Sequence, residues 1–352
     1  MPEMTSSFPQ PQSPKVSIVT PVFNGDKYLR TCIESVLAQT HDNWHYTIVD
    51  NCSTDNSLAI AREYAERYPQ VEVKSSTHHV GVVESHNRAF RLIAPDAEYC
   101  KVVSADDWLY PECVSRLVDL AERHPSTAMV ASYAARTTGV TWSSLPLEKE
   151  VFAGSEIGRL FLLNEVTYFF VPSTVLYRAS VVRATEAFFP GSAPSADLEA
   201  CLNCLKEGDL GFVHQILSFE RVHAEAVNFR IIQQKLQWLD GLRILNEFGP
   251  DFLTPEEQRR QVEWWLSGYF KDLAAGCVKL QAREFWSLHR DGLNQLGYSI
   301  YDRRLAEAIV GKALDLILNP KATAEKVAGR VKGRRSRLRR SDGGGDLQPW
   351  FG

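Results

Sequence analysis

The stretch "KVSIVTPVFNGDKYLRTCIESVLAQTHDNWHYTIVDNCSTDNS" at residues 15–57 decides the fold. Two short β-rich runs, "VSIVT" (16–20) and "HYTIVD" (45–50), flank a segment in which apolar side chains recur at helical spacing. Those side chains are Leu29, Cys32, Ile33, Val36 and Leu37. Their spacing puts one apolar stripe on a single helix face. A strand, an amphipathic helix and a second strand in this order predict a βαβ unit and a parallel sheet.

The alternation of strand and helix patterns continues to about residue 133. Further strands are predicted at 71–76, 99–104 and 127–133. After the second strand, "NCSTDNS" offers Ser53 or Thr54 as the N-cap of another helix. The inner face of that helix is formed by Ala61, Tyr64, Ala65 and Tyr68.

The loops that follow the predicted strands are rich in polar side chains. Open α/β sheets bind their ligands at the carboxyl ends of parallel strands, which lie on one edge. The loops after Thr20, Asp50 and Ser104 are therefore expected to meet at that edge. This convergence predicts the functional site.

The second half of the chain is less regular and then becomes helical. The segments "PSTVLYRAS" (172–180) and "HQILSFERVH" (214–223) are predicted strands, and Ala196 to Glu207 is a predicted helix between them. From about residue 231 the apolar spacing is helical to about residue 320. The proline-rich leader at 1–14 is predicted to be disordered, and the basic, then glycine-rich tail at 321–352 is predicted to be flexible.

The net charge of -4 combines an acidic body with a basic tail. Residues 321–352 hold nine Lys and Arg against three Asp and Glu, so the totals of 39 and 43 leave 30 and 40 for the body. An acidic body disfavours nucleic acid as a partner. Seven scattered cysteines favour reduced thiols in the cytoplasm over a disulfide framework. We expect no signal peptide and no membrane span, because no sufficiently long apolar run is present.

Two adjacent carboxylates follow a predicted strand in "KVVSADDWLYP" (101–111). The carboxylates of Asp106 and Asp107 are hard oxygen ligands, which suit a divalent cation that also holds a diphosphate. In the simpler alternative, one of them caps the helix that begins near Pro111 and the other is solvated. The residues alone leave both interpretations open.

Five ordered motifs resemble the family 2 glycosyltransferases. The stretch at 15–57 carries, after an apolar first strand, the family's P-x-[YF]-N turn, its S-[VIL]-x-x-Q-T helix end and its V-D-[DN]-x-S-x-D strand end. The segment "HVGVVESHNRAF" (79–90) resembles its N-x-G-x-x-x-A-x-N segment, and "SADDWLYP" resembles its D-x-D motif. The resemblance implies the GT-A fold, a Rossmann-like α/β fold with a mostly parallel central sheet flanked by helices. It also implies a nucleotide-sugar donor, Mn2+ or Mg2+, and inversion at the anomeric carbon.

The resemblance divides the chain into parts. Residues 15–230 would form the glycosyltransferase domain, with a nucleotide-sugar-binding half at 15–125 and an acceptor-side half at 126–230. A helical extension would follow at 231–320, and the basic tail would close the chain.

The family's donor-binding positions fall on the loops of the predicted edge. They are Thr20, Pro21, Val22, Asn24, Asn51, Ser53, Gly81, Asn87, Ser104 and Asp106. Asn51 stands where the family usually has an Asp that accepts a hydrogen bond from the base, which puts uracil recognition in doubt. The resemblance makes Asp107 the main metal ligand, places Asp106 beside the ribose and diphosphate, and offers His223 as a further ligand of the metal or the diphosphate. Ser104 replaces the first Asp of the D-x-D motif.

The family's general base is an acid that opens a helix in the second half, and "PSADLEACLNCL" fits that position. Asp197 is the predicted base and Glu199 the alternate. The competing interpretation is that an acid in the first turn only stabilises the helix dipole. His223 likewise has a structural alternative, in which it holds the end of a strand.

The implied reaction moves a sugar from a UDP-, GDP- or dTDP-sugar to a glycan or lipid-linked glycan of the O-antigen, capsule or lipopolysaccharide type. A nucleotidyltransferase would need a glycine-rich phosphate loop, and "TPVFNGDKYLR" has a single glycine. A non-catalytic relic of the fold that still binds sugar nucleotides would not need its three acids. The expected location is cytoplasmic, at the inner face of the cytoplasmic membrane. Peripheral contact with anionic lipid is expected through residues 321–340, which hold nine basic residues and one acid.

Overall fold

The computed structural model describes residues 13–318, except for 138, 142, 168–169, 192–194, 223–234 and 279–280. The chain divides into two compact units. The first comprises residues 1–161 and 165–226, and the second comprises residues 162–164 and 227–352.

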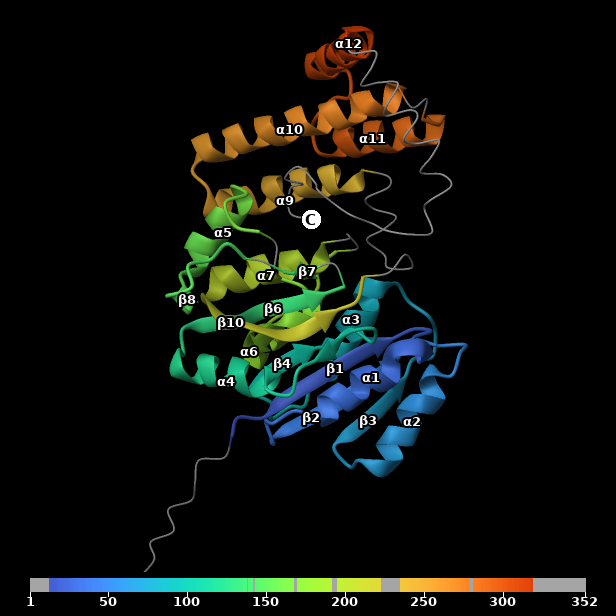
Figure 1. Ribbon diagram of the computed structural model, residues 1–352, viewed down its shortest axis with the longest axis vertical. Helices are drawn as coiled ribbons and strands as arrows, with labels where there is room; N and C mark the ends of the chain where they lie inside the picture. The colour runs from blue at the N-terminus through green and yellow to red at the C-terminus, as the bar shows by residue number, and fades with distance from the viewer. Residues whose placement is uncertain are drawn as a thin grey trace, which may run out of the picture. The chain divides into compact units, whose positions relative to one another are not determined.

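The first unit is built on one mixed sheet, to which the described residues contribute ten strands (Figure 1). The strands are β1 (Val16–Val22), β2 (Trp44–Asp50), β3 (Val71–Ser75), β4 (Tyr99–Val102), β5 (Trp108–Leu109), β6 (Thr127–Arg136), β7 (Gly139–Val140), β8 (Val151–Phe152), β9 (Val175–Arg178) and β10 (Asp209–Glu220). Their order is β3-β2-β1-β4-β9-β6-β10-β5, with β7 beside β6 and β8 beside β10. Strands β1 to β4, β6 and β10 run in one direction, whereas β9 runs against its neighbours β4 and β6. The predicted α/β class and the mostly parallel central sheet are confirmed.

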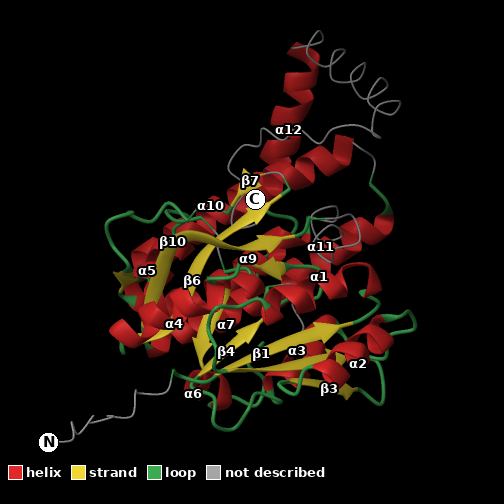
Figure 2. Cartoon of the chain, turned by 60° about the horizontal axis from the view of Figure 1, so that its bottom comes forward, coloured by secondary structure: helices red, strands yellow, loops and turns green. Residues whose placement is uncertain are grey.

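Helices cover both faces of the sheet (Figure 2). The helices of this unit are α1 (Asp26–Leu37), α2 (Ser57–Arg67), α3 (Val82–Phe90), α4 (Cys113–Arg123), α5 (Gly154–Leu162), α6 (Ala179–Arg183) and α7 (Ala196–Glu207), with a short 3-10 turn η1 (Pro172–Thr174). Helices α1, α2 and α4 share one hydrophobic core with the sheet. On α1 the predicted stripe is buried at Leu29, Cys32, Ile33 and Val36. Burial of each large apolar side chain contributes about 1.5–3 kcal/mol, which holds the helix to the sheet.

Proline lies inside β1, a strand that is central in the sheet. The ladder between β1 and β4 ends at Val19 and Val102, and Val19 O accepts from Val103 N on that side. Backbone groups alternate sides along a strand, so the nitrogen of Pro21 is on the β4 side, beyond the last paired residue of β4. No ladder hydrogen bond is therefore lost because proline has no N–H. The strand therefore continues to Val22, two residues past the predicted end, because β2 still borders it.

Two local predictions were wrong. The helix after β2 starts at Ser57, not at a cap on Ser53 or Thr54, because those residues are used to join two loops. The segment predicted as a strand over 172–180 is a strand only from Val175 to Arg178; it begins with the turn η1 and ends where α6 starts. The six cysteines whose side chains the structure describes are free, and two of them, Cys201 and Cys204, pack as buried side chains.

The second unit is helical in its described part, with α9 (Leu236–Phe252), α10 (Pro255–Val278), α11 (Arg283–Gln295) and α12 (Arg303–Leu318). Glycines let α9 and α10 approach closely, because a Cβ at Gly241 would lie 2.4 Å from the ring of Trp265. Trp265 is fully buried, so it belongs to this core. Within residues 13–318, less the stated gaps, we find no helix with the length and apolar character needed to cross a membrane.

Candidate active site

The predicted functional edge lies where β1, β2, β4 and β10 end. Backbone hydrogen bonds join the loops there, with Asn51 N donating to Val22 O and Val103 N to Val19 O. The reversed strand β9 adds an element that the sequence did not predict at this edge. Because β9 runs against β4, its amino end and the preceding turn η1 arrive at the carboxyl end of β4.

The two adjacent carboxylates have different surroundings. Asp107 is 3% exposed, and both of its oxygens accept hydrogen bonds, Oδ1 from Arg221 N at 2.9 Å and Oδ2 from Ser173 Oγ at 2.6 Å. Burial, helped by the neighbouring Asp106 charge, raises the pKa of Asp107 to about 7, and the two hydrogen bonds oppose that rise. Asp106 is partly exposed. Asp106, more than Asp107, is thus placed to meet a ligand.

Arg221 is a site residue that the sequence analysis missed. Its Nε donates to the backbone oxygen of Asp106 at 3.1 Å, and its guanidinium lies 4.1 Å from the ring centre of Tyr28 and 5.3 Å from that of Trp108. Trp108 in turn stacks on Phe219, with ring centres 3.8 Å apart and planes at 4°. The signal was present in "FERVH", but the prediction selected His223, which lies outside the described residues.

His86 on α3 is a second residue that the sequence analysis did not select. Its Nδ1 lies 2.8 Å from Val82 O, and its ring stacks on Phe189 with centres 5.3 Å apart. Burial lowers the pKa of His86, although the bond to Val82 and the charge of Asp106 oppose that shift. A neutral imidazole therefore lies within electrostatic reach of the acid pair.

Two of the predicted binding residues hold the first two loops together. Asn24 N donates to Ser53 Oγ at 3.0 Å, and Asn24 Oδ1 accepts from Thr54 N at 2.7 Å. Asn24 has a positive φ of 52°, a conformation that asparagine tolerates better than most residues. Asn24 and Ser53 thus shape the edge, and direct contact with a ligand stays a prediction for both.

The side-chain amides of the other two predicted asparagines, Asn51 and Asn87, are also bonded to backbone. Asn51 is 2% exposed; its Nδ2 donates to Val80 O at 2.8 Å and its Oδ1 accepts from Val80 N at 3.0 Å. Asn87 makes the same pair of bonds to Phe189, both at 2.8 Å. These bonds support a role in placing loops. Contact of either amide with a ligand stays a prediction.

The remaining predicted donor positions differ in accessibility. Thr20 is fully buried and its Oγ1 accepts from Tyr46 Oη at 2.9 Å, so the hydroxyl lies under the edge. Pro21 and Val22 are also buried at the end of β1. Ser104 is partly exposed, and Gly81, which precedes α3, is exposed with open space where a Cβ would be.

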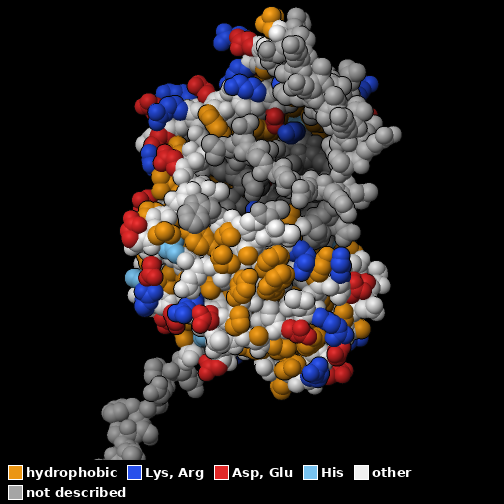
Figure 3. Space-filling view, in the orientation of Figure 1, with side chains coloured by type: hydrophobic (Ala, Val, Ile, Leu, Met, Phe, Trp, Pro, Cys, Tyr) orange, Lys and Arg blue, Asp and Glu red, His pale blue; other side chains and the backbone are white. Residues whose placement is uncertain are grey.

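Phe23 is 48% exposed beside His79, with ring centres 4.2 Å apart. Figure 3 shows hydrophobic side chains gathered between charged groups on the visible face of the first unit.

The two candidate bases lie at the start of α7, which has the predicted bounds. Asp197 is partly exposed and its Oδ1 accepts from Leu198 N at 2.9 Å. Glu199 is buried. A base must reach the acceptor hydroxyl, so the difference in exposure favours Asp197 over Glu199.

The comparison with family models gives the family of this site. Residues 17–185 match the model "Glycosyl transferase family 2", and this span contains the ends of β1, β2 and β4 and the acid pair. Residues 17–185 of the chain therefore form a family 2 glycosyltransferase domain. Its relatives include the uncharacterized glycosyltransferase YibD of Escherichia coli, which is 34% identical over 137 residues, 38% of this chain and 39% of that protein. The chain thus spans well under two thirds of that relative.

Solved structures share the fold of this chain. TarS residues 1–349 from S. aureus superpose with a TM-score of 0.60 at 16% identity, covering 80% of each chain. The mannosyltransferase PcManGT from Pyrobaculum calidifontis, solved with GDP-Man and Mn2+, has a TM-score of 0.54 at 13% identity and covers 86% of this chain and 87% of that one. At these identities the likeness confirms the GT-A fold.

The acid pair fits a metal only together with a ligand. Within the described ranges, no three His, Cys, Asp or Glu side chains lie close enough to hold a metal ion by themselves. Asp106 offers an oxygen donor of the kind that Mg2+ and Mn2+ prefer, and Mg2+ sites in proteins often take the remaining oxygens from substrate phosphates and water. The donor set therefore fits a cation that arrives with a diphosphate.

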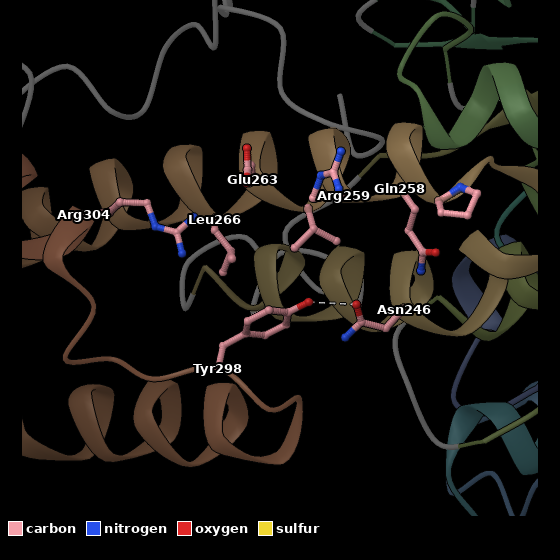
Figure 4. Close-up of a pocket in the computed structure, with 9 residues that line it drawn as sticks. Asn246, Gln258, Arg259, Glu263, Leu266, Tyr298 and Arg304 are labelled. Atoms are coloured by element: carbon pink, nitrogen blue, oxygen red, sulfur yellow. Dashed lines mark hydrogen bonds between the residues drawn. The ribbon is translucent and has the colours of Figure 1, made fainter.

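A hollow lies in the second unit (Figure 4). It measures about 460 Å³ and is lined by residues of α9 and α10 together with Tyr298 and Arg304. Tyr298 Oη donates to Asn246 Oδ1 at 2.9 Å across it. None of the predicted site residues lines this hollow.

Proposed function

We propose that the protein is an inverting, metal-dependent glycosyltransferase that moves a sugar from a nucleotide-sugar donor to a glycan or lipid-linked glycan acceptor. The observation that carries the proposal is that a partly exposed acid, Asp106, lies at the carboxyl edge of the sheet beside the guanidinium of Arg221, which bonds the Asp106 backbone oxygen. A carboxylate for a cation and a guanidinium for phosphate oxygens are the two groups that a departing diphosphate requires.

The leaving-group side of the reaction would use Asp106, Arg221 and His86. Asp106 would hold a divalent cation, and the cation when bound neutralises charge on the diphosphate. Arg221 is kept in one position by Tyr28 and by the backbone of Asp106, so its charge is preorganised for the developing phosphate charge. His86, held at Nδ1 by Val82, would present its Nε2 to the same group.

The nucleophile side would use Asp197. In an inverting transfer the acceptor oxygen bonds to the anomeric carbon as the bond from that carbon to the phosphate oxygen breaks. The proton of the acceptor hydroxyl passes to the Asp197 carboxylate. Arg221 would face the charge left on the diphosphate.

The donor's base would lie over Phe23 and His79, whose rings offer an exposed aromatic surface. TarS is named a poly(ribitol-phosphate) β-N-acetylglucosaminyltransferase and has been solved with UDP-GlcNAc, whereas PcManGT was solved with GDP-Man. Both UDP- and GDP-sugars are therefore candidates, and dTDP-sugars remain in the set. The acceptor is expected to be of O-antigen, capsule or lipopolysaccharide type.

A thermal-shift screen tests this function. Purified protein is heated with UDP-, GDP-, dTDP- and CMP-sugars, each with and without Mn2+, and donor hydrolysis is measured in parallel. A ligand at 100 times its Kd stabilises the folded state by about 2.7 kcal/mol, so a true donor should raise Tm by several degrees and only with metal. The absence of any metal-dependent shift and of hydrolysis for all four classes would refute the function.

We also propose that the protein acts at the inner face of the cytoplasmic membrane. Helix α12 exposes Val310, Leu314 and Leu318 by 58%, 50% and 73%, and residues 321–340, outside the described part, carry nine basic residues and one acid. Apolar side chains beside a basic run suit an anionic leaflet, where each Lys or Arg contributes up to about 1 kcal/mol. The full chain should sediment with anionic vesicles and be released by salt, whereas a chain ending at Leu318 should bind much less. Equal binding of the two would refute this location.

A further inference from the structure

A fully buried lysine lies on the strand that carries the acid pair. Lys101 on β4 has no exposed surface, and its Nζ donates to Ser173 O at 2.8 Å and approaches Val175 O at 3.4 Å. Burial lowers the pKa of Lys101. An amine so deep in a protein is costly unless it is hydrogen bonded, and here its partners are the turn η1 and the first residue of β9. Lys101 therefore ties the reversed strand to β4 where both reach the functional edge.

The turn η1, which Lys101 bonds, is itself hydrogen bonded to the loop that carries the acid pair. Ser173 Oγ donates to Asp107 Oδ2 at 2.6 Å and accepts from Ser104 N at 3.1 Å. Asp107 Oδ1 accepts from Arg221 N at 2.9 Å. One buried chain of hydrogen bonds thus runs from Lys101 through Ser173 and Asp107 to Arg221. It joins β4, η1, the loop after β4 and the end of β10.

We propose that Lys101 and Ser173 are positioning residues that act through Asp107 to hold Asp106 and Arg221 in place for the donor's diphosphate. The inference rests on the proposed function, because that function supplies the diphosphate. It assigns Asp107 a different role from the one the resemblance implied. With both oxygens taken by protein donors, Asp107 is the link that fixes the residue before it and the arginine opposite it.

The partners of Asp107 explain how the Arg221 guanidinium stays available. A buried carboxylate needs donors, and two hydrogen bonds from Ser173 and Arg221 N supply them without adding a second charged side chain. The guanidinium of Arg221 is thereby left to bond the Asp106 backbone and pack on Tyr28. Arg221 follows Glu220, the last paired residue of β10, so loss of the bond from Arg221 N to Asp107 would free the backbone that carries this guanidinium.

Ser173→Ala tests the positioning role of Ser173, with Ser17→Ala as the matched control. Ser17 is equally buried and also accepts a backbone N–H, from Ala94 at 3.0 Å, but it lies at the opposite end of β1. Amide hydrogen exchange is measured on peptides that contain Ser104 and Arg221, in protein without ligand. Ser173→Ala removes the acceptor of Ser104 N and one of the two donors that hold Asp107, so exchange of both amides should quicken at least about tenfold in Ser173→Ala and stay unchanged in Ser17→Ala. Unchanged exchange of both amides in Ser173→Ala would overturn the proposal.

The second measurement is binding of UDP, GDP and dTDP over a range of Mn2+ concentrations. Loss of a residue that orients a metal site lowers metal affinity by about 10–100-fold, so Ser173→Ala should need correspondingly more Mn2+ for half-maximal nucleotide binding. Ser173→Thr, which keeps the hydroxyl, should restore most of it, and Lys101→Met should lower binding in the same way as Ser173→Ala. Ser17→Ala should bind as the unchanged protein does.

The outcomes separate two failures. If the unchanged protein binds none of these nucleotides with Mn2+, the proposed function is wrong, whatever the exchange data show. If it binds and Ser173→Ala binds equally well at the same Mn2+, the function stands and the positioning role is overturned.

Discussion

Replacement of Asn51 by Asp tests how the edge of the sheet is built. The family usually has Asp at this position, so the substitution restores the common residue. In this chain, however, the amide is 2% exposed and bonds both the N–H and the C=O of Val80. We expect Asn51→Asp to destabilise the protein and not to improve binding of a uridine nucleotide.

The size of the effect follows from the two bonds. An aspartate keeps the bond from Val80 N but has no hydrogen for Val80 O, now 2.8 Å from an oxygen in place of a nitrogen. Leaving a buried acceptor without its donor costs about 1–3 kcal/mol, and burial of the new charge adds to this. A loss of about 2 kcal/mol corresponds to a fall in Tm of about 4–8 °C for a domain of this size.

The assay combines thermal unfolding with titration of UDP in the presence of Mn2+. Asn87→Asp is the matched control, because Asn87 makes the same pair of bonds to the backbone of Phe189. Both variants should lose Tm by similar amounts, and neither should bind UDP more tightly than the unchanged protein. An Asn51→Asp protein with normal Tm and tighter UDP binding would show that residue 51 contacts the base directly, and would refute the loop-placing role.

Three further substitutions separate ligand contacts from structural ones. Asp106→Asn should keep Tm within about 2 °C and abolish metal-dependent nucleotide binding. Asp107→Ala should lower both Tm and nucleotide binding, because it removes a buried partner of Ser173 and Arg221. If unfolding and titration curves showed the reverse pattern, Asp107 would be the metal ligand. Gly81→Ala should leave Tm unchanged, since open space surrounds the new methyl group, but weaken donor binding if the nucleotide packs there; unchanged Kd would remove Gly81 from the site. Asp197→Asn should retain donor affinity and Tm but transfer sugar roughly 10²–10⁴-fold more slowly, and near-normal steady-state transfer would exclude Asp197 as the base.

Local pattern was sufficient for much of the first unit. The apolar spacing of Leu29, Cys32, Ile33 and Val36 predicted α1, because a stripe at helical spacing has one stable place, against a sheet. Strand runs with polar ends predicted the edge where the acid pair lies, because parallel strands end together. The bounds of α7, Ala196 to Glu207, were also predicted from pattern.

The partners of each polar side chain were decided only by tertiary structure. Asp106 and Asp107 are neighbours of the same type, and no local rule says which one is buried. The answer depends on β9, which runs in reverse and brings Ser173 to Asp107 across 66 positions, and on β10, which brings Arg221 from a still greater separation. Hydrogen bonds of this kind depend on how strands are ordered in the sheet. The periodicity of side chains along one strand does not predict that order. The sequence therefore determined which elements form and where the edge lies, and the fold decided that Asp106 stays accessible while Asp107 is held inside.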